Sequence, residues 1–280
     1  MLTQFSDRSW LWIAAGFYLA GFLLGTFSLL RGGRPSTAVN SAAIVAGYLF
    51  QLFGLYLRGR AVGGCPLGNR FEIYQFTAWS ATTLYLCIGV TFRSSLFGYF
   101  TACLTAVLTL VSLAIPSWDP ALRTHPFGGN PWIELHAALA VFSYGVFGLL
   151  ALTSLMFLLR NYSLKSKHLG GGFSFLPSIL DLDHISVRLL AAGVTLLGAS
   201  LAVGSVYWIR DPSTVNVSKL VVTVAVWLAY AIGLGFRLRG VLLARRFAWT
   251  CAALFAAALI SLGPVDASRH PQTPAHAVPR

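Results

Sequence analysis

Long apolar runs alternate along the chain with short connections that contain Arg, Lys, Pro or Gly. Eight runs carry charged residues only near their ends, and each reaches about 18 residues, the length at which a run is read as a membrane span. They lie near residues 10–30, 38–57, 72–92, 95–115, 134–159, 186–208, 219–236 and 246–263. Because roughly 20 helical residues cross the hydrocarbon core of a bilayer, the pattern predicts about eight transmembrane helices.

The expected fold is all-α, a polytopic membrane helical bundle. Inside lipid every backbone N–H and C=O must bond within the protein, so a span is either a helix or part of a closed barrel. The alternating polar and apolar decamers of a barrel do not occur in the sequence. We expect residues 1–263 to form a single integral membrane domain. Residues 264–280 are rich in Pro and polar residues and are expected to form a flexible C-terminal tail.

Composition narrows the class of protein further. Hydrophobic residues make up 56% of the chain and charged residues 10%, against about 25% charged residues in soluble proteins. A soluble enzyme and a coiled coil are therefore excluded. The formal net charge is +12, but the basic residues stand in short groups between the runs, so they indicate membrane topology and predict no nucleic-acid partner.

The basic residues are almost evenly divided between the two sides. Connections 1–2, 3–4, 5–6 and 7–8 hold ten, and the opposite side with both termini holds nine. This small bias predicts that the termini of this multi-pass protein lie on the outer side. The membrane expected for the protein is the cytoplasmic (inner) membrane. The arginines that remain on the outer side either hold an anionic group there or have no role beyond the basic character of the chain.

Several chemistries lose support from the sequence. The middles of the eight runs contain no Asp, Glu, Lys or Arg, which weakens a proton- or ion-coupled transporter because such proteins place ionisable groups near mid-membrane. A small-molecule transporter remains an alternative. The four cysteines form neither Cys-x-x-Cys nor Cys-x-x-Cys-His, so thiol redox chemistry, zinc and covalent c-type haem attachment are not indicated.

His136 is the histidine of the six that lies within an apolar run, about one turn into the fifth. At helical spacing it shares a face with Ala140, Ser143 and Phe147, small and aromatic residues that would let a flat ring lie against the helix. A neutral imidazole at this place can ligate iron. From the sequence alone, a histidine that only makes hydrogen bonds between helices explains the position better than an iron ligand does.

The third run carries a polar stripe formed by Glu72, Gln75, Trp79 and Thr83. These residues recur at helical spacing, so the stripe must face protein or a cavity rather than lipid. Hydrogen bonds between helices explain the stripe without a ligand.

Five short motifs follow one another along most of the chain, from about residue 48 to 263. They are Asn69 to Glu72 with Trp79, Leu135-His136 with Ser143-Tyr144, Leu164-Lys165, His184 to Leu189, and Trp227 to Arg237 followed by Arg245-Arg246. In this order they resemble the cytochrome c assembly proteins that handle haem, the CcsA/CcmC/HemX group. Haem-presenting members carry a tryptophan-rich loop where this chain has one tryptophan, in Tyr207 to Ser213. This departure makes the chain most similar to the eight-span HemX-like branch.

The resemblance implies a membrane haem-binding factor for cytochrome c biogenesis, without turnover of its own. It would hold or present non-covalent haem at the outer face for attachment to apocytochrome c, with other cytochrome c assembly subunits as partners. His136 would ligate the iron, with His270 as the second ligand. The remaining site residues implied are Trp208 and Trp132 against the porphyrin faces, and Arg70, Arg123 and Arg210 at the propionates. The alternative is a HemX-like interaction or regulatory protein of tetrapyrrole metabolism that does not handle haem.

Overall fold

The computed structural model describes residues 6–33, 35–89, 95–119, 122, 124–125, 127–165, 178–210 and 217–267. Within the helices it describes the backbone alone at residues 88–89, 95–96, 207–210, 218–219 and 261–267. These described residues form eight α-helices and one short 3-10 helix, η2 (Pro116–Trp118). The helices are α1 (Asp7–Leu30), α2 (Thr37–Val62), α3 (Arg70–Gly89), α4 (Ser95–Ala114), α5 (Pro131–Lys165), α6 (Ile179–Arg210), α7 (Val217–Leu238) and α8 (Ala244–Ala267).

The all-α prediction is confirmed, and each predicted run corresponds to one helix. Over the described residues, six helices are long and apolar enough to cross a membrane: α1, α2, α4, α5, α6 and α7. The chain is therefore a polytopic membrane bundle. The helix α3 is not among the six because it carries polar side chains, and Gln75, Ser80 and Thr82 of this helix are fully buried inside the protein.

Local signals explain several helix ends. Ser6 and Ser36 precede α1 and α2, and their hydroxyls accept hydrogen bonds from the backbone N–H groups of Ser9 and Val39. The helix α2 ends at Gly63, whose φ of 71° lies in the left-handed region that glycine adopts without strain.

The far end of the chain differs from the prediction. Residues 264–267, expected to begin the flexible tail, continue α8. Helix ends are the part of an element that sequence patterns locate least sharply, and Val265 and Ala267 keep this stretch partly apolar. The rest of the predicted tail lies outside the described residues.

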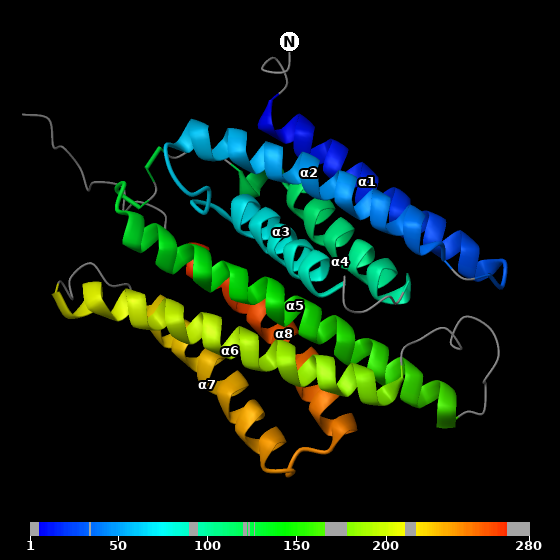
Figure 1. The fold of residues 1–280 in the computed structure, drawn as a ribbon. Coiled ribbons are helices and arrows are strands. Elements are labelled where there is room, and N and C mark those ends of the chain that lie inside the picture. Colours follow the sequence, from blue (N-terminus) through cyan, green and yellow to red (C-terminus); the bar gives the residue numbers. More distant parts are fainter. Residues whose placement is uncertain are drawn as a thin grey trace, which may run out of the picture.

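Consecutive helices run in opposite directions and form two groups that meet at α5 (Figure 1). Helices α1 to α4 lie on one side of α5, and α6, α7 and α8 lie on the other. The central position of α5 matches its burial, since nearly every side chain from Ser143 to Phe157 is buried.

Close packing joins α5 to its neighbours. Phe147 of α5 stacks on Tyr230 of α7 with ring centroids 3.8 Å apart and an interplanar angle of 4°. Gly193 of α6 faces Phe147, and a Cβ at this glycine would lie 2.8 Å from Cδ1 of the ring. A glycine is therefore required here for α6 to approach α5.

Candidate functional site

Because the helices alternate in direction, α1, α3, α5 and α7 begin at the end of the bundle where α2, α4, α6 and α8 finish (Figure 1). We call this the His136 end, since His136 lies in the second turn of α5. Most of the residues implied by the family resemblance belong to this end.

The imidazole of His136 is held by the facing helix α6. Its Nδ1 lies 2.6 Å from the backbone oxygen of Ser200, and the Ser200 hydroxyl donates to the backbone oxygen of His136 at 2.8 Å. A carbonyl oxygen only accepts hydrogen bonds, so the proton of a neutral ring sits on Nδ1. The lone pair is then on Nε2. Metal-ligating histidines commonly have this arrangement, in which a backbone carbonyl holds one ring N–H and the other nitrogen is the ligand.

The face of α5 around His136 is open toward the start of the helix and closed toward its middle. Trp132, one turn earlier, is 58% exposed, and Leu135 is 42% exposed. In the other direction Ser143 is buried and Phe147 is used in the stack on Tyr230. The expectation that Phe147 would help to carry a flat ligand is therefore wrong, because helix packing occupies that ring.

Arg70 lies at the same depth as the start of α5. The parallel helices α3 and α5 touch through Trp79 and Phe142, whose ring centroids are 6.3 Å apart. Arg70 precedes Trp79 by nine residues, and Trp132 precedes Phe142 by ten. At about 1.5 Å of rise per residue, both lie about 14 to 15 Å from this contact. The structure thus brings His136, Trp132 and Arg70 to one end of the bundle.

The other predicted site residues are described in part or not at all. Trp208 and Arg210 belong to the last turn of α6, where the structure describes the backbone alone. Trp208 follows Ser200 by eight residues, so its backbone lies about 12 Å beyond the level of His136, toward the end of the bundle. Arg123 and His270 lie outside the described residues.

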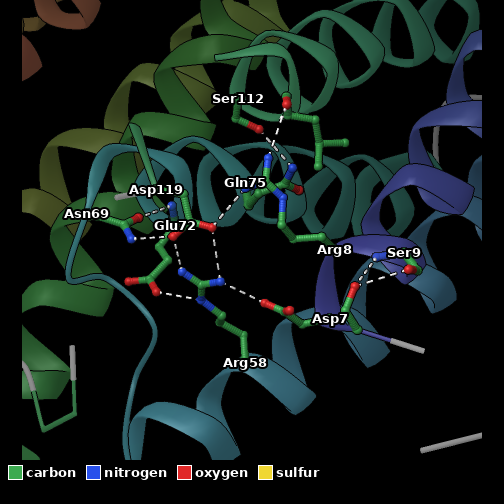
Figure 2. A network of polar contacts seen from close by, with 11 residues as sticks. Asp7, Arg8, Ser9, Arg58, Asn69, Glu72, Gln75, Ser112 and Asp119 are labelled. Atoms are coloured by element: carbon green, nitrogen blue, oxygen red, sulfur yellow. Dashed lines mark hydrogen bonds and ion pairs between the residues drawn. The ribbon is translucent and has the colours of Figure 1, made fainter. Parts of the chain in front are cut away.

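A buried network of charges, which the sequence analysis does not identify as a site, lies among α1 to α4 at the His136 end (Figure 2). Its centre is Arg58 of α2, which is 3% exposed. The guanidinium donates to Glu72 at 2.8 Å and to Asp7 at 2.8 Å, and it forms a two-pronged ion pair with Asp119. The α2 C-terminus, the α1 N-terminus, α3 and the segment after η2 are thereby joined.

Further contacts complete this network. Asn69 donates to Asp119 at 3.0 Å and accepts from the backbone N–H of Glu72 at 2.9 Å, which caps the start of α3. Arg8 donates to Asp119 at 3.3 Å. The network therefore holds two arginines and three carboxylates.

The anions that Arg58 and Arg8 hold are thus carboxylates of the chain itself. Arg58 and Arg8 therefore fit neither explanation offered for the outer arginines. They do not point to a bound anionic ligand, and they have a structural role beyond membrane topology.

One turn further into the bundle, amides replace the charges. Gln51 of α2 donates to Gln75 of α3 at 3.0 Å and accepts from Tyr18 at 2.9 Å. Gln75 donates to the hydroxyl of Ser112 in α4 at 2.8 Å. The polar stripe predicted on α3 therefore makes hydrogen bonds between helices over its first turns, and Glu72 and Gln75 are buried by these contacts.

The α2–α3 loop is attached to the start of α5. The Glu134 carboxylate accepts from the backbone N–H of Cys65 at 3.2 Å, and the backbone N–H of His125 donates to Val62 at 2.7 Å. Burial, together with the negative charges of Glu134 and Glu72, raises the pKa of the Cys65 thiol to about 11. This thiol is therefore protonated and weakly nucleophilic at neutral pH.

Comparisons with a family model and with individual proteins relate most of this chain to known sequences. A model of the family described as cytochrome C assembly protein matches residues 67–264. Protein HemX of Brevibacillus brevis is 25% identical over 203 residues, which cover 72% of this chain and 74% of HemX. The inner membrane protein YpjD of Escherichia coli has the same identity and coverage. The cytochrome c biogenesis protein CcsA of Chlamydomonas reinhardtii is 26% identical over 229 residues, 77% of this chain but only 62% of CcsA, less than two thirds of its length.

Proposed function

The chain belongs to the cytochrome C assembly protein family, and from this membership we propose that it is a membrane haem-binding factor of cytochrome c biogenesis. It holds haem at the His136 end of the bundle and presents it for attachment to apocytochrome c. The observation that carries the proposal is the hydrogen bond between Nδ1 of His136 and the backbone oxygen of Ser200. This bond leaves the lone pair of the imidazole on Nε2, where a nitrogen that is to ligate iron needs it.

The surroundings of His136 suit a planar, partly apolar ligand with two carboxylates. Trp132 offers an exposed aromatic surface one turn away, and Arg70 supplies a cation at the same depth. When bound, haem would supply an iron that the imidazole of His136 can ligate. Phe147 and Tyr230 close the inner side, so the ligand lies toward the start of α5 and not in the middle of the membrane.

Four further residues complete the proposed site from the family resemblance: His270 as second iron ligand, Trp208 against the porphyrin, and Arg123 and Arg210 at the propionates. Other cytochrome c assembly subunits would be the partners. In this proposal the chain binds and orients haem, with the His136 ring held in place by Ser200. We propose that it catalyses no reaction of its own.

We place the protein in the cytoplasmic (inner) membrane with both termini and the His136 end on the outer side. The similarity to the inner membrane protein YpjD and the bias of basic residues toward the opposite connections support this placement.

The test is an absorbance spectrum of detergent-purified protein after loading with hemin. We expect a haem spectrum in the wild type and, in His136→Ala, a loss of bound haem of at least about tenfold. His184→Ala is the matched control, because His184 is an exposed histidine near the start of α6, at the opposite end of the bundle.

Added imidazole should restore a haem spectrum in His136→Ala, which separates a missing ligand from a misfolded protein. Equal haem content in wild type and His136→Ala would contradict the proposal.

A second candidate is a HemX-like interaction or regulatory protein that does not handle haem. The sequence comparisons favour this candidate in one respect, because the matched region covers 74% of HemX but 62% of CcsA. This candidate predicts no haem in the wild type and co-purification with an enzyme of tetrapyrrole metabolism.

A further inference from the structure

The turn that joins α7 to α8, at the end of the bundle opposite His136, is rich in arginine. Arg237, Arg239, Arg245 and Arg246 fall within ten residues. One of them is used by the fold: Arg237 pairs with Asp183 of α6, donates to the backbone oxygen of Leu242 at 3.0 Å and lies 5.4 Å over the Phe247 ring. Arg237 therefore ties the turn to α6 and α8.

The backbone of this turn is closed by its own hydrogen bonds. Gly240 has a φ of 72°. Its N–H donates to the backbone oxygen of Arg237 at 3.1 Å, and the N–H of Val241 donates to the backbone oxygen of Phe236 at 3.0 Å. This is the pattern of a glycine-terminated helix end. The side chains that follow are thus presented by an ordered turn and not by a loose loop.

The three other arginines are presented outward. Arg239, Arg245 and Arg246 are exposed, and no ion pair joins them to a carboxylate in the described ranges of the chain. The acidic groups on this side are engaged elsewhere, since Asp183 pairs with Arg237 and Asp181 accepts from the Ser178 hydroxyl at 2.6 Å. The outer surface of the turn is therefore a concentration of positive charge.

Large apolar side chains surround these charges. Leu238, Val241 and Leu243 are 71%, 65% and 67% exposed, and Trp249 is 58% exposed. Trp249 follows Arg245 by four residues and Arg246 by three, so all three lie toward one face of α8. Arginine beside exposed tryptophan and aliphatic side chains matches the headgroup region of a bilayer, where guanidinium groups meet phosphates and indole rings lie at the interface.

We propose that the α7–α8 turn is a binding site for an anionic phospholipid, with Arg239, Arg245 and Arg246 on the headgroup phosphodiester. The acyl chains lie along Leu243 and Trp249. A free phosphate ion would use the charges but leave the apolar side chains uncovered, which is why the surface favours a lipid. The site is separate from the proposed haem site and does not depend on it.

The test measures lipid preference of the full chain in detergent by native mass spectrometry with phosphatidylglycerol and phosphatidylcholine. We expect the wild type to prefer phosphatidylglycerol. In the double variant Arg245→Gln with Arg246→Gln this preference should fall about 25-fold, or roughly fivefold for each arginine. The matched control is Arg31→Gln with Lys165→Gln, which removes two exposed charges from the same end but outside the turn.

Loss of the preference in the turn variant alone supports the lipid site. An equal fall in the control variant, or a wild type without preference, overturns it. Displacement of phosphatidylglycerol by an equal concentration of glycerol 3-phosphate also overturns it, because the occupant would then be a small phosphate. Thermal unfolding of each variant in the same detergent must match the wild type, which excludes a folding defect as the cause.

Discussion

Arg58 is a buried cation whose partners come from distant parts of the sequence. Asp7 and Asp119 are separated from it by 51 and 61 residues, and Glu72 by 14. Removing one member of such a buried group is costly, because the remaining charges cannot return to water. Arg58 is therefore a structural residue that fixes how α1, α2 and α3 meet.

We predict that Arg58→Gln destabilises the protein by about 3–5 kcal/mol, because three carboxylates would then share a buried site with Arg8 as the remaining cation. Arg60→Gln removes the same charge from the same helix at an exposed position and should change stability by less than about 0.5 kcal/mol. Denaturant titration in detergent, followed by circular dichroism, measures both. Identical midpoints for the two variants would show that the network contributes nothing.

The sequence alone marks His136 as a candidate for a specific contact, but it does not mark Ser200. A histidine inside an apolar run is conspicuous because a polar ring in the membrane needs a partner. Ser200 belongs to a run of small residues, Gly198 to Ser200, which indicates close helix contact but names no partner. The pairing across 64 residues of sequence depends on the register of α5 against α6.

Helix contacts in this bundle depend on glycine at particular places. A Cβ at Gly145 of α5 would lie 2.8 Å from the backbone nitrogen of Ala81 in α3 and still closer to the Ser80 hydroxyl. Contact with backbone atoms cannot be relieved by a rotamer change, so α3 and α5 must separate if this position gains a side chain.

We predict that Gly145→Ala lowers stability by about 1–3 kcal/mol through this overpacking. Gly235→Ala on α7 is the matched control, because a Cβ there meets no atom within 4 Å and alanine favours a helix by up to about 1 kcal/mol. The midpoint of thermal unfolding should therefore fall for Gly145→Ala and stay level or rise for Gly235→Ala. A fall of equal size in both variants would contradict this account.

The eight helices of the described residues alternate in direction, so α1 begins and α8 ends at the His136 end (Figure 1). Without the two arginines of the C-terminal segment, Arg269 and Arg280, the connections on the opposite side hold ten basic residues against seven. By the positive-inside rule this bias supports the orientation proposed above, in which the opposite side is cytoplasmic and the His136 end faces outward.

We predict that alkaline phosphatase fused to the C-terminus is active and that green fluorescent protein fused there is dark, as an outward C-terminus requires. A chain truncated after Lys165, at the end of α5, should give the reverse pattern with both reporters. A fluorescent C-terminal fusion would invert the assignment and place the His136 end in the cytoplasm.

Length and hydropathy of each run are local properties, and they were sufficient to predict an all-α membrane bundle with one helix for each run. The five ordered motifs were likewise sufficient to recognise the family, because they depend on neighbouring residues alone. The partners of buried polar groups, in contrast, could not be predicted from neighbouring residues. Arg58 stands at the edge of an apolar run, and nothing near it in the sequence shows that Asp7, Glu72 and Asp119 will surround it. Such contacts, like the hydrogen bond of His136 to Ser200, arise when helices pack at a specific depth and rotation, which side-chain fit throughout the bundle decides.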